Sequence, residues 1–151
     1  MLKIGLLGCG RISKNHFEAI AAQPDAQCIA CCDIIEDRAK EAAKKYNIPT
    51  WTTSYEEMLS DPNIDLISIC TPSGLHPEHG IQAAKAGKHV LTEKPMACRL
   101  VEADELIKAC DEAGVKLFVV LQNRLNPSIQ LVRRAFEEGR FGQIYMITSN
   151  V

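Results

Sequence analysis

The first twenty residues, MLKIGLLGCGRISKNHFEAI (residues 1–20), decide the fold. A short apolar run, Leu2–Leu7, leads into the segment GCGRIS of residues 8–13, and an amphipathic run follows over Ile12–Ala22. This pattern predicts a strand, a tight glycine-containing turn and a helix in direct succession. Ser13 stands where a third glycine is expected, and its side chain is small enough for close packing of the helix against the strand.

The same alternation of apolar and amphipathic runs continues along the chain. Strands are predicted over Leu2–Leu7, Gln27–Asp33, Leu66–Cys70, His89–Thr92 and Lys116–Leu121. Helices are predicted over Ile12–Ala22, Ile35–Tyr46, Ser54–Leu59, Pro77–Ala86, Leu100–Ala113 and Pro127–Glu138. The strands are nearly continuous apolar runs, which is typical of parallel strands covered on both faces. The sequence therefore predicts an α/β fold with a doubly wound parallel sheet of the Rossmann type.

The glycine-containing turn has the features of a pyrophosphate-binding turn. Gly8 permits a tight turn, and Gly10 lets the backbone approach a pyrophosphate. Arg11 and Ile12 then lead into the helix, whose free N–H groups attract an anion. A plain turn between strand and helix is the competing interpretation, and it does not explain the acid that follows at the expected distance.

That acid is Asp33, which ends the second predicted strand about 20 residues after the glycines. A carboxylate at this position accepts hydrogen bonds from the ribose 2′-hydroxyl of a dinucleotide and repels a 2′-phosphate. Ile34 and Ile35 follow it rather than an arginine, so the sequence favours NAD over NADP. Arg38, one helical turn further on, weakens this preference.

Composition limits the other classes of function. The chain has 151 residues, of which 46% are hydrophobic, and a formal net charge of -2. These values suit an ordinary folded domain and argue against binding to nucleic acid or to a membrane surface. No apolar run is long enough to span a bilayer, and the first residues do not form a signal peptide, so we expect a cytoplasmic protein.

The seven cysteines are an odd number without a secretion signal, which indicates reduced thiols. Cys28 and Cys31 form a C-x-x-C pattern within a predicted strand. Residues three apart in a regular strand point to opposite faces, so the two sulfurs are not expected to share a metal. We expect these thiols to behave as small buried apolar groups and predict no metal site.

Three polar clusters directly follow predicted strands, at the edge of the sheet where the glycine turn also lies. They are the segments TPSGLH (Thr71–His76), EKP (Glu93–Pro95) and QNRLNP (Gln122–Pro127). His79 is interpreted as an ordinary helix residue, and His16 and His89 show no pattern that points to a function.

These segments carry a resemblance. GCGRIS, CTPSGLH, EKP and QNRLNP together resemble the glucose–fructose oxidoreductase and inositol dehydrogenase (Gfo/Idh/MocA) family, and the likeness covers essentially the whole chain. Within that family the tail from Gln122 onward is similar to nucleotide-sugar 3-dehydrogenases, which oxidise UDP-N-acetylglucosaminuronate.

The resemblance implies roles for individual residues. Those expected to bind the cofactor NAD are Gly8, Gly10, Arg11, Ile12, Asp33, Thr71, Pro72, His76, Glu93, Lys94 and Gln122, with His76 at the edge of the cleft. Lys94, Asn123 and Arg124 are expected to bind substrate. Lys94 is the expected catalytic residue, beside both nicotinamide and substrate.

The chemistry of Lys94 agrees with that role. Oxidation of an alcohol requires removal of the hydroxyl proton and stabilisation of negative charge on oxygen. A lysine at the end of a strand can donate a hydrogen bond to that oxygen, and in its neutral form it can also act as the base. The alternative interpretation is a surface lysine paired with Glu93. Arg124 is a candidate for binding a carboxylate or phosphate of the substrate.

The end of the chain predicts a second domain. Residues 1–125 are expected to form the dinucleotide-binding domain, and residues 126–151 a connecting helix and the first strand, over Gly142–Val151, of a C-terminal α/β domain that the chain lacks. Family members have such a domain, which often forms the oligomer interface.

Two functions remain open. The first is an NAD-dependent oxidoreductase that transfers hydride between nicotinamide and a hydroxyl of a sugar or nucleotide sugar, homo-oligomeric in its full-length form and inactive as this chain alone. The second is a non-catalytic NAD-binding sensor or regulatory module.

Overall fold

A computed structural model describes residues 1–148 of the chain. This part divides into two compact units, one of residues Met1–Val120 and one that begins at Leu121, and each is described by itself. The first unit contains six strands: β1 (Leu2–Leu7), β2 (Ala26–Cys32), β3 (Thr50–Thr52), β4 (Leu66–Ile69), β5 (His89–Thr92) and β6 (Leu117–Val119). Its helices are α1 (Ser13–Ala21), α2 (Glu36–Tyr46), α3 (Tyr55–Ser60), α4 (His76–Lys85) and α5 (Leu100–Ala113), with the short 3₁₀ turn η1 (Ser73–Leu75).

The strands form one parallel sheet in the order β3-β2-β1-β4-β5-β6. The chain runs outward from β1 to β3, returns to the other side of β1 and continues from β4 to β6. This order is that of a doubly wound Rossmann sheet, and its direction reverses between β1 and β4. The predicted fold class is therefore confirmed.

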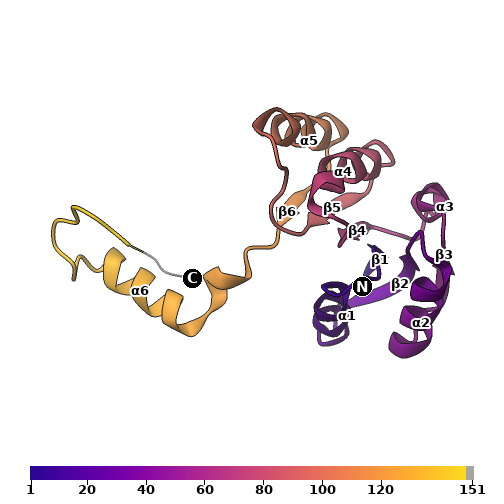
Figure 1. The fold of residues 1–151 in the computed structure, drawn as a ribbon, viewed down its shortest axis with the longest axis horizontal. Helices are drawn as coiled ribbons and strands as arrows, with labels where there is room; N and C mark the ends of the chain where they lie inside the picture. The colour runs from indigo at the N-terminus through magenta and orange to yellow at the C-terminus, as the bar shows by residue number, and fades with distance from the viewer. Residues whose placement is uncertain (149–151) are drawn as a thin grey trace. The chain divides into compact units, whose positions relative to one another are not determined.

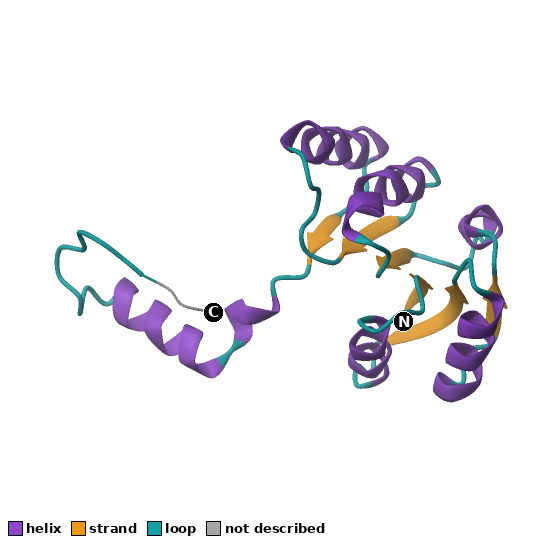
Figure 2. Ribbon diagram, viewed as in Figure 1, coloured by secondary structure: helices purple, strands orange, loops and turns teal. Residues whose placement is uncertain are grey.

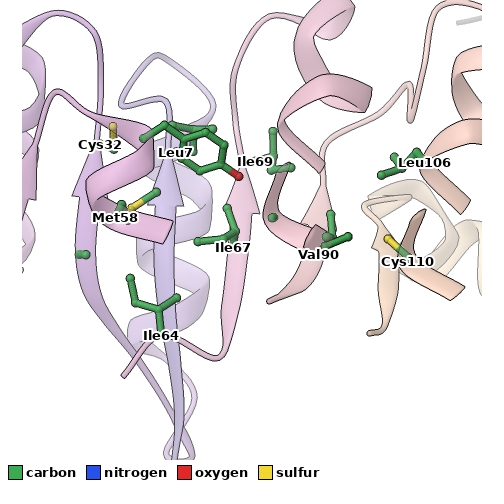
Figure 3. Close-up of a cluster of buried hydrophobic side chains, with 13 residues drawn as sticks. Leu7, Cys32, Met58, Ile64, Ile67, Ile69, Val90, Leu106 and Cys110 are labelled. Carbon is green, nitrogen blue, oxygen red and sulfur yellow. The ribbon is translucent and has the colours of Figure 1, made fainter. Parts of the chain in front are cut away.

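Helices cover both faces of this sheet, and each face has its own apolar core. Figures 1 and 2 show α4 and α5 on one side of the sheet and α1 and α2 on the other. The core beneath α3, α4 and α5 includes the side chains labelled in Figure 3: Leu7, Cys32, Met58, Ile64, Ile67, Ile69, Val90, Leu106 and Cys110. The core beneath α1 and α2 is made by Ile4, Leu6, Phe17, Ile20, Cys28, Cys31, Ala42, Ala43, Leu66 and Cys70. Burial of a large aliphatic side chain contributes about 1.5–3 kcal/mol, so these two cores stabilise the sheet that positions the site.

The ends of the helices have identifiable causes. At the start of α3 the hydroxyl oxygen of Ser54 accepts a hydrogen bond from the backbone N–H of Glu57, at 3.2 Å. The α5 helix ends at Gly114, which takes the left-handed conformation with φ +67°. Asn47 does the same after α2, with φ 54°.

The strand β2 is irregular, and this corrects the expectation for the cysteines. Ile4 on β1 pairs with Cys28, but the next residue, Gly5, pairs with Ala30, so Ile29 is an extra residue in a β-bulge. The bulge turns Cys28 and Cys31 toward the same core rather than to opposite faces. Both thiols are buried, and they donate to the carbonyl oxygens of Ala30 and Ala39, at 3.4 and 3.5 Å. Their behaviour as small apolar groups is thus as expected, although the geometric reason was wrong.

The second unit contains η2 (Gln122–Leu125) and α6 (Pro127–Glu137). The predicted strand over Gly142–Val151 does not form within residues 142–148, and residues 149–151 lie outside the described part. Among the helices within residues 1–148, none is both long and apolar enough to cross a membrane.

Candidate functional site

A groove of about 640 Å³ opens at the carboxyl edge of the sheet, beside the point where the strand order reverses. Thr53, Tyr55 and Glu56, after β3, form one part of its lining, and three further groups carry the residues of interest. The glycine turn contributes Gly8, Gly10, Arg11 and Ile12; the end of β2 and the start of α2 contribute Asp33, Ile34 and Arg38; and the region after β4 contributes Cys70, Thr71, Pro72, Leu75 and His79. The structure therefore brings together seven of the residues expected to bind the cofactor: Gly8, Gly10, Arg11, Ile12, Asp33, Thr71 and Pro72.

The two glycines of the turn have different surroundings. Gly8 has φ +91°, and a Cβ atom there would lie 2.9 Å from the carbonyl carbon and oxygen of Cys70. Only glycine fits this position without strain. A Cβ at Gly10 would meet no protein atom within 4 Å, so the space above this backbone is open to the groove.

The helix that follows the turn begins without a side-chain cap. Ile12 is its N-cap residue and offers no hydrogen-bonding side chain. Ser13 is buried, and its hydroxyl donates to the carbonyl oxygen of Gly10 at 2.6 Å, which ties the turn to the helix. An uncapped helix start beside an open glycine backbone suits a pyrophosphate group, so the residues present fit a dinucleotide.

Asp33 is 7% exposed and has a structural role as well as a place in the groove. One carboxylate oxygen accepts the backbone N–H of Cys9 at 2.8 Å, and the other accepts that of Ile35 at 2.9 Å. Ile34, between these elements, is 90% exposed on the lining of the groove. The acid thus links the glycine turn to the start of α2.

His76 is placed differently from the expectation. It does not stand at the cleft edge but is 1% exposed, and its ring nitrogens lie 2.8 Å from the carbonyl oxygens of Pro95 and Thr71. The reason is that α4 starts at this residue and turns its side chain inward, between the ends of β4 and β5. His76 therefore connects the loop after β4 to the loop after β5.

His79, interpreted from the sequence as an ordinary helix residue, lines the groove instead. Its Nδ1 lies 3.0 Å from the hydroxyl of Thr71, and its backbone carbonyl accepts the phenolic O–H of Tyr55 at 2.8 Å. Burial lowers the pKa of His79 below its usual value. Its position three residues after His76, in the first turn of the helix that follows β4, was the available signal.

The segment Glu93–Lys94 follows β5 at the same edge, although neither side chain is part of the groove lining described above. Glu93 is 7% exposed, and its carboxylate accepts hydrogen bonds from the His16 ring at 2.9 Å and from the Lys94 backbone N–H at 3.1 Å. The Lys94 side chain is exposed. Within residues 1–148, no ion pair joins it to Glu93, so the alternative interpretation of a paired surface lysine is not observed.

Gln122, Asn123 and Arg124 belong to the second unit, where they form the exposed turn η2. The roles expected for them stay predictions. In the described part of the chain, no group of three or more histidine, cysteine, aspartate or glutamate side chains is arranged to hold a metal ion.

The sheet order, the glycine turn and the buried acid define a dinucleotide-binding domain of the Rossmann type. The chain belongs to the Gfo/Idh/MocA family, described as an oxidoreductase family with an NAD-binding Rossmann fold, whose model matches residues 2–121.

Known relatives have similar sequences and structures. The chain superimposes with a TM-score of 0.91 on the WlbA dehydrogenase from Bordetella pertussis in complex with NADH and UDP-GlcNAcA, at 48% identity, covering 95% of this chain and 42% of that one. It is 32% identical to a myo-inositol 2-dehydrogenase from Thermotoga maritima, over 97% of this chain and 44% of the relative. It is also 32% identical to a levoglucosan dehydrogenase from Pseudarthrobacter phenanthrenivorans, over 95% of this chain and 39% of the relative. The chain thus spans less than half the length of these relatives.

Proposed function

We propose that the protein containing this chain is an NAD-dependent dehydrogenase that acts on a hydroxyl of a sugar or nucleotide sugar. The observation that carries the proposal is the groove, which joins the open backbone of Gly10 to Asp33 at the reversal of strand order. The similarity to WlbA, described in complex with NADH and UDP-GlcNAcA, supports a nucleotide sugar as the substrate class.

Different residues of the chain bind the two ends of the cofactor. Gly8, Gly10 and the start of α1 hold the pyrophosphate, and Asp33 holds the adenosine ribose. Thr71 and Pro72 line the path toward the reacting end. NAD bound along this path would supply the hydride acceptor at that end.

Lys94 carries out the proton chemistry in this proposal. As the hydroxyl is oxidised, the Lys94 amine takes up the hydroxyl proton as general base, and the ammonium group that results stays hydrogen-bonded to the product oxygen and stabilises negative charge on it. Asn123 and Arg124 bind the substrate, and Arg124 pairs with its carboxylate or phosphate. Gln122 and Glu93 complete the nicotinamide end.

We further infer that residues 126–151 connect to a C-terminal α/β domain that completes the substrate pocket. The exposed apolar side chains of this region support the inference, among them Phe136 at 59% and Tyr145 at 90% exposure. The shared length with relatives is consistent with it, since 42–44% of WlbA and of the myo-inositol dehydrogenase is matched. In the whole protein, that domain forms a homo-oligomer interface. The cytoplasm is the proposed location.

Replacing Lys94 tests the proposal. Lys94→Ala in the whole protein should leave NADH binding nearly intact, because the lysine contacts the reacting end. It should slow hydride transfer by roughly 10²–10⁴-fold, the scale of losing a positioned proton-transfer group. Stopped-flow measurement of NADH formation from UDP-GlcNAcA gives the rate, and fluorescence titration gives the affinity.

Lys85→Ala is the matched control, since Lys85 is an exposed lysine at the end of α4 that leads toward the opposite edge of the sheet. If hydride transfer were equally fast in Lys94→Ala and in the unmodified protein, Lys94 would have no part in the mechanism. Binding of NADH without turnover of any sugar or nucleotide sugar would favour the sensor module.

A further inference from the structure

A buried histidine, His16, connects three elements of the first unit, and the proposed mechanism does not use it. His16 lies on α1 and is 8% exposed. Its Nδ1 is 2.8 Å from the hydroxyl oxygen of Ser68 on β4, and its Nε2 is 2.9 Å from a carboxylate oxygen of Glu93. These partners are 52 and 77 residues away in the sequence.

The chemistry of the partners decides which atom donates. An ionised carboxylate only accepts, so His16 Nε2–H donates to Glu93. The hydroxyl of Ser68 then donates to Nδ1, and a neutral ring satisfies both contacts. The second carboxylate oxygen of Glu93 accepts the backbone N–H of Lys94 at 3.1 Å. A continuous series of hydrogen bonds therefore runs from β4 through α1 to the backbone of Lys94.

The two contacts of His16 are buried. Ser68 is fully buried and Glu93 is 7% exposed. Hydrogen bonds to a charged group in such surroundings are short and strong, and a buried carboxylate that loses a donor is costly. Among the described residues, no buried side-chain nitrogen or oxygen lacks a partner, so each buried side-chain atom of the series makes at least one hydrogen bond.

We propose that His16 is a positioning residue for Lys94. It fixes the carboxylate of Glu93, and that carboxylate fixes the backbone from which the Lys94 side chain extends. His16 lies one helical turn after Ser13, the first residue of α1, so this contact ties the lysine to the helix that begins at the pyrophosphate turn. The inference rests on the proposed role of Lys94.

The other side of Lys94 is held separately. The Nδ1 of His76 lies 2.8 Å from the carbonyl oxygen of Pro95, and its Nε2 lies 2.8 Å from that of Thr71. Loss of the His16 contact is therefore expected to loosen Glu93 and Lys94 while the loop stays attached at Pro95. This predicts a local effect on Lys94 rather than unfolding of the site.

Two substitutions of His16 separate its two hydrogen bonds. In His16→Asn, the side-chain oxygen takes the place of Nδ1 and accepts from Ser68, but the side chain is too short to reach Glu93. In His16→Gln, the amide nitrogen extends toward the place of Nε2 and donates to Glu93. His89→Gln is the control, since His89 begins β5 at the opposite edge of the sheet.

Three measurements on the whole protein apply to each variant: hydrogen–deuterium exchange of the peptide that contains the Lys94 amide, the single-turnover rate of NADH formation from UDP-GlcNAcA, and NADH affinity. We expect His16→Asn to exchange the Lys94 amide faster and to slow hydride transfer by roughly 10²-fold, the scale for a small misplacement of a reacting group. NADH affinity should be unchanged. His16→Gln should restore most of both properties, and His89→Gln should change neither.

Unaltered exchange or an unaltered hydride-transfer rate in a folded His16→Asn variant would overturn the inference. If that variant does not fold, His16→Gln and Glu93→Gln decide instead. The side-chain amide in Glu93→Gln cannot accept both hydrogen bonds. We therefore expect fast exchange of the Lys94 amide and slow hydride transfer in this variant. Normal exchange or a normal hydride-transfer rate would contradict the inference. Failure of the proposed function has a different signature, namely a normal rate in Lys94→Ala.

Discussion

At the scale of single residues, Asp33 has two tasks. Both of its carboxylate oxygens accept backbone N–H groups, one from Cys9 in the glycine turn and one from Ile35 at the start of α2. The same carboxylate lines the groove where a ribose is expected. The residue expected to select the cofactor therefore also holds the turn expected to bind it.

We predict that the protein binds NADH more tightly than NADPH and that Asp33→Ala reduces this difference. Loss of hydrogen bonds to a charged group costs about 1.5–3 kcal/mol, so NADH affinity should fall roughly 10–100-fold. NADPH should gain little, because relief of repulsion is offset by a looser turn. Calorimetric titration with both cofactors measures this, with Asp37→Ala, an exposed acid on α2, as control. Equal affinities in the unmodified protein would contradict the assignment to NAD.

The burial and pKa values of the cysteine thiols predict which of them react with a disulfide reagent. Burial is the main cause that raises the pKa values of Cys28, Cys32 and Cys70 to about 12. The Cys9 thiol donates to the carbonyl oxygen of Cys32 at 3.7 Å. The nearby Cys31 thiol raises the pKa of Cys9, and Cys9 lowers the pKa of Cys31, but Cys31 is fully buried.

Cys98 is exposed, unlike these thiols and against the sequence expectation of buried cysteines. At pH 8 we expect one thiol of the folded chain to react rapidly with a disulfide reagent such as DTNB, and all 7 to react after denaturation. Cys98→Ser should remove the fast phase. A fast phase that persists in this variant would show that the packing over the other thiols opens readily.

At the scale of elements, the glycine turn predicts opposite outcomes for its two glycines. Gly8→Ala places a methyl group against the backbone of Cys70 at an unfavourable φ, so the free energy of unfolding should fall by about 1–3 kcal/mol. Gly10→Ala meets no protein atom within 4 Å and should leave stability nearly unchanged. It should weaken NADH binding by roughly tenfold or more, since the methyl group occupies the approach to the pyrophosphate.

Chemical denaturation and fluorescence titration distinguish the two glycine variants. A loss of stability in Gly10→Ala equal to that in Gly8→Ala would mean that the open space above Gly10 is filled by protein in solution. Unaltered NADH affinity in Gly10→Ala would place the pyrophosphate elsewhere.

Elements with a strong periodic pattern were predictable from the sequence. The strands Leu2–Leu7 and His89–Thr92 and the helix Leu100–Ala113 have the predicted bounds, and most others differ by one or two residues. The strand β3 was missed because its three residues at the sheet edge, Thr50–Thr52, show no apolar run. The bulge at Ile29 was missed because strand register depends on the neighbouring strand.

The site was predictable to the extent that it is local in sequence. The glycines and Asp33 were found because the turn and the acid have a characteristic spacing. The contact between His16 and Glu93 spans 77 residues and depends on how α1 packs against β4 and β5, which no local pattern records. For the same reason the burial of His76 was not foreseen.

At the scale of the whole molecule, every side chain of the two apolar cores belongs to the first unit. We therefore expect a chain that ends at Val120 to unfold cooperatively and to bind NADH. A chain that ends at Gly114 lacks β6, leaves β5 unpaired on one side, and should have a clearly lower Tm. Thermal unfolding and fluorescence titration test both.

The chain that ends at Val120 also lacks Gln122, so it tests the expected contribution of Gln122 to NADH binding. NADH affinity in the chain that ends at Val120 should match that of Gln122→Ala in the longer chain. Loss of folding in the chain that ends at Val120 would mean that residues beyond it are part of the core, against the observed division into two units.

The bulge in β2 affects how many residues are needed between the glycine turn and Asp33. Ile29 and Ala30 both face the core beneath α3, α4 and α5, whereas Cys28 and Cys31 face the other one. Without Ile29, the remaining residues would alternate regularly between the two cores, and Ala30 would still pair with Gly5. An insertion or deletion at this point therefore leaves Asp33 where it is. We therefore expect that a sequence one residue shorter between the glycine turn and this acid keeps the acid in the same place, so the spacing alone does not indicate which cofactor is bound.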